Sequence, residues 1–100
     1  MTYEVLDRGN GRIVLRGQFN ETTAGKALMA GEKLFARYGE INVDLAEVDC
    51  ANTASVAMLV EWSMWARALD KKIFYENIPA GLMAIAKVNY VDQFLHRKSG

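Results

Sequence analysis

Between Ile41 and Pro79 the chain reads as a buried strand, a short polar loop, a long apolar helix and a second buried strand. An apolar helix set between two buried strands needs a sheet to pack against. Buried strands that alternate with helices imply a mixed sheet whose face is covered by those helices. This segment therefore predicts an α/β fold.

The residues before this segment predict a hairpin and a first helix. Gly and Asn tolerate positive φ, so Arg8-Gly9-Asn10-Gly11 predicts a turn between strands at Tyr3–Asp7 and Arg12–Phe19. The polar residues 20–23 can cap a helix that we expect over about residues 24–38. The order of elements thus begins strand, strand, helix.

The second half of the chain continues this alternation. We expect a strand from Ile41 to Val48, a helix over about residues 54–69 and a short strand at 73–75. Pro79 favours the first turn of a last helix, which we expect over about residues 80–88. Phe94 and Leu95 are expected to form a short terminal strand. The pattern predicts a mixed sheet of four to five strands with three or more helices packed mainly on one face.

Length and composition limit the possible classes of protein. One hundred residues allow a single core, so we expect one domain over residues 1–100. Lys+Arg and Asp+Glu both number 12, which argues against a nucleic-acid partner or a polybasic membrane patch. The single cysteine, Cys50, indicates a reducing compartment. With neither a signal-peptide pattern nor a membrane-spanning apolar run, we expect a cytoplasmic protein without direct membrane insertion.

Few side chains in the sequence are suited to catalysis or to metal binding. Cys50 has no nearby His or Asn partner and is expected to be an inert structural thiol. His96 is the only histidine, and one His with one Cys cannot form a metal site. Asp44, Glu47 and Asp49 could attract a cation, but solvated or capping carboxylates are commoner. We therefore expect no enzyme activity, no metal and no cofactor.

The helix expected over residues 54–69 is apolar nearly all round. One arc of its helical wheel is the expected core face, and it holds Met58, Leu59, Trp62, Trp65, Ala66 and Leu69. Val56, Val60 and Met64 lie outside that arc, and Met83 faces outward from the next helix. A small chain has little core to spare, so these residues either complete the core or are covered by a protein partner.

The loop Asn52-Thr53-Ala54-Ser55 places two hydroxyls at the start of this helix. Backbone N–H groups at a helix start are unpaired, so one interpretation is a cap that contributes about 1 kcal/mol. The other is that Thr53 or Ser55 accepts a phosphoryl group or contacts a partner, since phosphorylation adds about two negative charges there. The local residues alone favour the cap.

This stretch resembles the STAS domain family (sulfate transporter and anti-sigma factor antagonist). The family has an Asp-Leu step in a strand and then Asp-Ser-Ser-Gly-Leu at a helix start. This chain has Asp44-Leu45 and Asn52-Thr53-Ala54-Ser55-Val56 in those places. Lys71-Lys72, the strand at 73–75 and Asn77-Ile78-Pro79 continue the family order. The resemblance implies a STAS fold along essentially the whole chain.

Thr53 stands where the family has its phosphorylatable Ser, and this is similar to the small STAS subunits of Mla-type ABC phospholipid transporters. The resemblance implies a non-catalytic subunit that binds and regulates the ATPase of a lipid-asymmetry transporter, peripheral to the inner membrane through that partner. The implied interface consists of Asn52, Thr53, Val56, Val60, Met64 and Met83. The alternative is an anti-sigma factor antagonist or related switch, in which an anti-sigma factor or serine kinase partner acts through Thr53 or Ser55.

Overall fold

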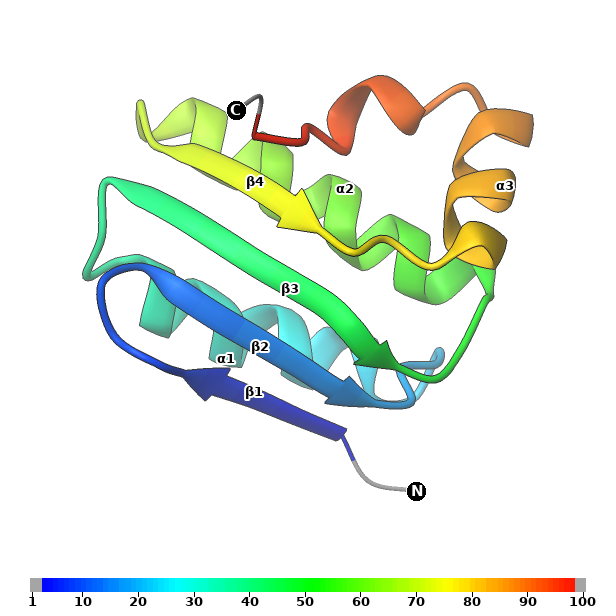
Figure 1. The fold of residues 1–100 in the computed structure, drawn as a ribbon, viewed down its shortest axis with the longest axis horizontal. Helices are drawn as coiled ribbons and strands as arrows, with labels where there is room; N and C mark the ends of the chain where they lie inside the picture. The colour runs from blue at the N-terminus through cyan, green and yellow to red at the C-terminus, as the bar shows by residue number, and fades with distance from the viewer. Residues whose placement is uncertain (1–2, 99–100) are drawn as a thin grey trace.

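The computed structural model describes residues 3–98, in which α1 and α2 cover one face of a four-stranded sheet (Figure 1). In chain order the elements are β1 (Tyr3–Asp7), β2 (Arg12–Gly17), α1 (Ala24–Phe35), β3 (Glu40–Val48), α2 (Thr53–Ala68), β4 (Lys72–Glu76), α3 (Ala80–Val88) and the 3-10 helix η1 (Asp92–Phe94). The predicted α/β fold, with a mixed sheet and three α-helices, is confirmed.

The strands lie in the order β1-β2-β3-β4. β1 and β2 are antiparallel, and their turn contains Asn10 with a φ of 55°. β2, β3 and β4 are mutually parallel and are connected through α1 and α2. Because parallel strands end at the same edge of a sheet, the loops that lead into α1 and α2 are neighbours. The Asn52 Nδ2 donates to the Phe19 carbonyl oxygen at 2.8 Å across these two loops.

The core lies between the sheet and the helices. Alternate residues of β2, β3 and β4 point toward the helices and are buried, as the period of a strand requires. These residues are Ile13, Leu15, Ile41, Val43, Leu45, Ile73 and Tyr75. From the helices, Trp62 of α2 packs edge-on against Phe35 of α1, with the ring centroids 5.0 Å apart. The two helices are therefore held together by an aromatic contact as well as by the sheet beneath them.

The prediction of a terminal strand at Phe94 and Leu95 is wrong. Residues 92–94 form η1, and Leu95 is buried. Ser63 of α2 donates from its Oγ to the Phe94 carbonyl oxygen at 2.6 Å, which holds this part of the chain against α2. The segment after η1 reaches β4 through a backbone hydrogen bond from the Tyr75 N–H to the His96 carbonyl oxygen. That contact does not extend into a strand.

Asp7 joins the β1–β2 turn to the end of α1. Its carboxylate accepts hydrogen bonds from the Gly9 N–H at 2.8 Å and from the Tyr38 hydroxyl at 2.9 Å. Arg37 lies 3.4 Å away. These contacts lower the pKa of Asp7, with the Gly9 hydrogen bond as the main cause. The same carboxylate raises the pKa of Tyr38 through their hydrogen bond.

The lowered pKa of Asp7 predicts a specific loss of stability in acid. A carboxyl whose pKa is lower in the folded state stabilises the fold above its unfolded pKa of about 4. That contribution disappears as the pH falls through the folded pKa. We expect Asp7→Asn to reduce the difference in unfolding free energy between pH 7 and pH 3, measured by urea denaturation. An identical difference in the variant and the parent chain would contradict this role of Asp7.

Candidate functional site

The start of α2 is closed by Asn52 and Ser55, which cap each other. The Asn52 Oδ1 accepts from the Ser55 N–H at 2.8 Å, and the Asn52 N–H donates to the Ser55 Oγ at 3.4 Å. The Ser55 hydroxyl also donates to the Asn52 carbonyl oxygen at 2.8 Å. This reciprocal arrangement is a capping box, which satisfies two backbone donors at the helix start. The predicted cap is present. Its shortest hydrogen bond to a backbone N–H, however, is accepted by the side-chain amide oxygen of Asn52 and not by a hydroxyl.

The two hydroxyls of the loop therefore have different surroundings. Ser55 is only 1% exposed and its hydroxyl is engaged in the cap. The hypothesis that Ser55 is a modifiable or partner-contacting hydroxyl is contradicted by this burial, which follows from the place of Ser55 one turn into the helix. Thr53 is the first residue of α2 and is exposed. Of the two hydroxyls, Thr53 is the one that a partner or an enzyme can reach.

A shallow polar depression opens beside Thr53. It lies between the loop before α1 and the start of α2, and it is lined by Asn20, Glu21, Thr22, Asn52, Thr53 and Ala54. The Asn20 Oδ1 already accepts from the Thr22 N–H at 2.8 Å. Asn52 is likewise engaged in the cap. The two amide side chains that line the depression therefore form hydrogen bonds within their own loops. The depression places Thr53 on an accessible surface.

The outward face of α2 carries two charged residues, Glu61 and Arg67. We call this face the α2 ridge, and it consists of Thr53, Ala57, Val60, Glu61, Met64, Arg67 and Ala68. Met64 is 56% exposed, whereas Val60 is half-buried and packs against the edge of the core. Glu61 and Arg67 are the charged members of the ridge, and their charges are opposite in sign. Methionine is enriched in protein interfaces, so the exposed Met64 makes the ridge resemble a surface that a partner covers.

Two residues of α2 and its end do not lie where the helical wheel predicts. Val56 was expected outside the core but is 3% exposed. Its side of α2 also carries the buried Ser63, and α3 and η1 pack over this side. Leu69 was expected in the core but is 52% exposed, because α2 ends at Ala68 and Leu69 leaves the helical path. Val56 is therefore removed from the candidate interface.

The start of α3 continues the surface formed by the start of α2. A Cβ on Gly81 would lie 2.9 Å from the Cβ of Ala51, so α3 begins in close contact with the loop before α2. Met83 of α3 is half-buried, and its neighbours Ala80 and Ala84 are exposed. Small residues thus allow α3 to approach the loop, and they extend an uncharged surface from Thr53 onto α3.

A buried polar pair attaches η1 and β4 to α2. The Tyr75 hydroxyl donates to the Leu59 carbonyl oxygen at 2.6 Å, and the Ser63 Oγ donates to the Phe94 carbonyl oxygen at 2.6 Å. Burial raises the pKa of Tyr75, so its hydroxyl stays protonated. A serine within an apolar helix was the available signal for a buried hydrogen bond.

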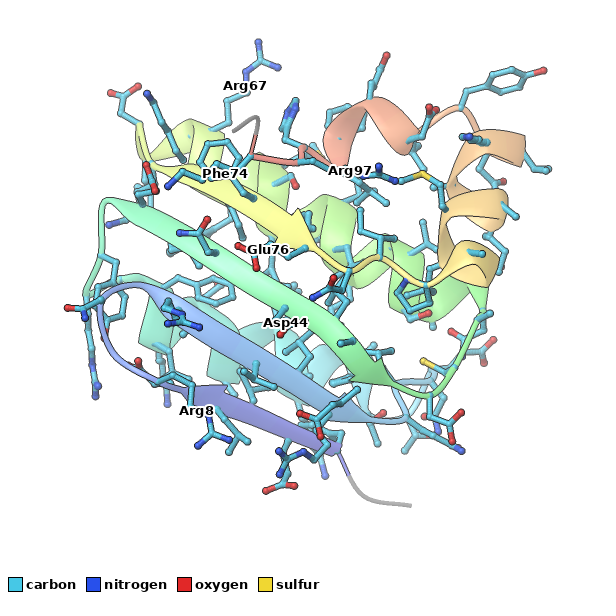
Figure 2. All side chains as sticks on the ribbon, in the orientation of Figure 1. Arg8, Asp44, Arg67, Phe74, Glu76 and Arg97 are labelled. Carbon is cyan, nitrogen blue, oxygen red and sulfur yellow. The ribbon has the colours of Figure 1, made fainter. Side chains whose placement is uncertain are left out.

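The other candidate groups have structural partners. Cys50 is half-buried and accepts a weak hydrogen bond from the Phe19 N–H at 3.5 Å. Glu47 pairs with Arg16 at 2.9 Å, and Asp44 accepts from the Asn77 Nδ2 at 3.0 Å. Figure 2 shows Asp44 on the face of the sheet turned away from α1 and α2.

Residues 3–98 contain no cluster of three or more His, Cys, Asp or Glu side chains positioned to hold a metal ion. Within the same part of the chain, no helix is both long enough and apolar enough to cross a membrane.

Comparisons with known proteins agree on the fold. The family model described as "Mlab, STAS domain" matches residues 4–96. No curated protein sequence is a significant match. A chain of the Acinetobacter MlaFEDB complex in an ATP-bound conformation is similar, with a TM-score of 0.76 and 22% identity over 89% of this chain and 95% of that chain.

The anti-sigma factor antagonist SpoIIAA is also similar in structure. Its unphosphorylated form has a TM-score of 0.72 at 7% identity, over 98% of this chain and 89% of that chain. Its phosphorylated form, described as a Bacillus cell fate determinant, has a TM-score of 0.69 at 7% identity, over 98% and 92% of the two chains. At such low identities these structures establish a shared fold.

Proposed function

The chain belongs to the Mlab STAS domain family, and from this premise we propose that it is a non-catalytic subunit that binds and regulates the ATPase of an ABC-type phospholipid transporter. The observation that carries the proposal is the α2 ridge, a helix face that starts at Thr53 and exposes Met64 to solvent. The likeness to a chain of the MlaFEDB complex supports the same partner class. Under this proposal the chain acts at the cytoplasmic face of the inner membrane through its partner.

The geometry of the ridge supports docking without a large rearrangement. The capping box holds the start of α2 in one conformation, so little ordering is needed when a partner binds. Val60 and Met64 supply apolar surface, and Met83 extends it on α3. Binding to the folded ATPase stabilises that subunit by mass action, which is a direct route to regulation of its assembly and activity.

A second candidate function is a phospho-switch like that of an anti-sigma factor antagonist. The exposed Thr53 at a helix start and the fold shared with SpoIIAA favour it. Under this alternative, a serine/threonine kinase modifies Thr53. Incubation with the kinase of the same organism followed by mass spectrometry would find the phosphate on Thr53 and not on the buried Ser55.

The proposed function is tested by recovery of the transporter from native membranes. We expect the tagged chain to retain an ATP-binding subunit and a permease, identified by mass spectrometry. Thr53→Glu should reduce this recovery about tenfold, which corresponds to about 1.4 kcal/mol, since a carboxylate would be buried against an apolar partner. A negative charge at a helix start does not destabilise the helix, so the thermal midpoint of the variant should not fall.

Thr53→Ser keeps a hydroxyl at this position and is the matched control, with recovery equal to that of the parent chain. If neither transporter subunit accompanies the parent chain, the proposed function is wrong. If Thr53→Glu recovers both subunits as well as the parent does, Thr53 is outside the interface.

A further inference from the structure

Three connections of the chain meet at one end of the sheet. They are the β1–β2 turn, the loop from α1 to β3 and the loop from α2 to β4, and Figure 1 shows them together at the end opposite the start of α2. The Tyr38 hydroxyl donates to Asp7 of the turn at 2.9 Å, and the Lys71 Nζ donates to the Tyr38 carbonyl oxygen at 2.8 Å. The Lys72 N–H donates to the Gly39 carbonyl oxygen at 2.9 Å. Side chains from all three connections therefore share one surface.

Two of the carboxylates at this end are paired with basic side chains. Asp7 lies 3.4 Å from Arg37, and Glu40 pairs with Lys98. Two acidic residues are outside these pairs, the half-buried Glu32 and the exposed Asp70. The acidic side chains at this end thus number four, and two of them are already neutralised.

Five further basic side chains surround the same end, and none of them forms an ion pair with another residue between 3 and 98. All five are exposed. Two belong to the β1–β2 turn and its end, one each to the last turns of α1 and α2, and one to the start of β4. We call this surface the basic edge, and the five residues are Arg8, Arg12, Lys33, Arg67 and Lys72.

The rest of the chain has the opposite balance of charge. With Lys71 and the two paired cations, this end holds eight of the 12 basic residues and four of the 12 acidic ones. Four basic and eight acidic residues remain for the other parts of the chain. The equal totals in the sequence therefore conceal a strong separation of charge, and such a field orients a protein at a charged surface.

The helix ends account for only part of the basic edge. Lys33 and Arg67 lie in the last turns of α1 and α2, where a cation complements the helix dipole. Arg8 and Arg12 lie at a turn between strands, and Lys72 begins a strand, so no helix dipole explains these three. The positive excess is therefore larger than the helix ends require.

The other side chains at this end favour a lipid surface over a nucleic acid. Single-stranded nucleic acids are bound by exposed aromatic rings on which the bases stack. Among the described residues of this end no aromatic side chain is exposed, since Tyr38 and Phe74 are both half-buried and Lys98 lies over the Phe74 ring. The exposed large apolar side chain here is instead Leu69, which is 52% exposed and two residues after Arg67. Basic residues around an exposed leucine suit the headgroup region of an anionic membrane.

The basic edge also stays accessible when a partner occupies the start of α2. Thr53 and the basic edge lie at opposite ends of the sheet (Figure 1). Arg67 is the one residue that the basic edge shares with the α2 ridge. The cytoplasmic leaflet of a membrane carries anionic lipids. A chain held beside that leaflet through the α2 ridge would therefore keep its excess positive charge free to meet an anionic surface.

We propose that the basic edge contacts the anionic phospholipid headgroups of the membrane beside which the partner holds this chain. The inference goes beyond the proposed function and rests on it for the position of the chain. Each Lys or Arg near an anionic membrane strengthens binding about fivefold, so this small excess of charge gives weak binding on its own. Attachment to the membrane complex raises the effective concentration, and the weak contact then orients the subunit.

Sedimentation with lipid vesicles tests the inference on the isolated chain. The probe is a vesicle of equal parts phosphatidylglycerol and phosphatidylcholine, and a vesicle of phosphatidylcholine alone is the uncharged control. We expect binding to the anionic vesicle at about 20 mM salt and none to the control. The binding should disappear at about 500 mM salt, where the screening length falls to about 4 Å.

A pair of charge reversals locates the contact. Arg8→Glu with Arg12→Glu should weaken binding to the anionic vesicle about tenfold or more. Lys26→Glu with Lys87→Glu is the matched control, because it changes the net charge equally at exposed positions of α1 and α3 outside the basic edge, and it should bind as the parent chain does. Thermal midpoints show whether each variant folds. Arg8→Gln with Arg12→Gln, with a smaller expected loss, replaces the first pair if that pair unfolds.

Three results would overturn the inference. They are no binding of the parent chain to the anionic vesicle at low salt, equal weakening by the two pairs of reversals, and binding to single-stranded RNA without binding to the vesicle. The proposed function is judged separately, since Arg8→Glu with Arg12→Glu should still recover the ATP-binding subunit from native membranes. If the parent chain recovers no such subunit, the proposed function fails whatever the vesicles show.

Discussion

Gly31→Val is expected to destabilise the fold by about 3 kcal/mol or more. A Cβ on Gly31 would lie 2.5 Å from the Cζ2 and 2.8 Å from the Cε2 of Trp62. The indole cannot move away, since it is fully buried and its Nε1–H donates to the Leu28 carbonyl oxygen at 3.0 Å. Overpacking of a rigid core site costs about 1–3 kcal/mol, and the branched side chain adds further atoms to the clash.

Chemical denaturation followed by circular dichroism measures this loss, and Gly25→Ala is the matched control. Gly25 lies in the same helix, and a Cβ there would meet nothing within 4 Å. Alanine has the higher helix propensity, so the control should gain up to about 0.5 kcal/mol. A Gly31→Val chain as stable as the parent would show that α1 and α2 can separate without cost, which would contradict the packing described for Trp62.

Met64→Glu is expected to weaken binding of the ATPase subunit about a hundredfold or more without unfolding the chain. Met64 is 56% exposed in the middle of the α2 ridge, so a glutamate there is solvated in the free protein. Docking would bury it between Glu61, three residues earlier, and Arg67, three residues later on the same face. Removing a carboxylate from water costs several kcal/mol, which exceeds both the contribution of a single apolar contact and the attraction of Arg67.

Met29→Glu is the matched control for this prediction. Met29 is 65% exposed on α1, outside the α2 ridge and outside α3. Titration of the purified ATPase subunit by calorimetry should give the parent Kd for Met29→Glu and no measurable binding for Met64→Glu. Equal loss of binding in both variants would indicate a general effect of added charge, and retention in both would exclude the ridge as the interface.

Much of the fold could be predicted because each element has a local signal. The glycines around Asn10 predicted the β1–β2 turn, and the alternation of apolar residues predicted β2 and β3. The polar loop at Asn52 predicted the start of α2 to within one residue. The structure of residues 92–95 could not be predicted from local signals. It depends on the hydrogen bond from Ser63 to Phe94, which joins residues far apart in the chain.

The candidate site was only partly predictable for a related reason. A helical wheel gives the direction of each side chain around α2, and on this basis Val60 and Met64 were placed outside the core. It does not tell which sides of the helix the rest of the chain covers. Val56 became buried and Leu69 became exposed for that reason. The basic edge had no signal in the charge totals, since its residues come from segments that only the fold brings together.

By itself, then, the sequence determined the α/β class, the order of strands and helices and the apolar character of α2, because these depend on residues close together in the chain. Only the tertiary structure decided that Ser55 is buried, that Thr53 is exposed and that basic residues gather at one end of the sheet. Exposure depends on which distant segments pack over a side chain, and a single sequence holds no direct record of those contacts. The apolar helix between two buried strands predicted the class of fold. Only the packing of α3 and η1 against one side of that helix decided which of its faces remains exposed to a partner.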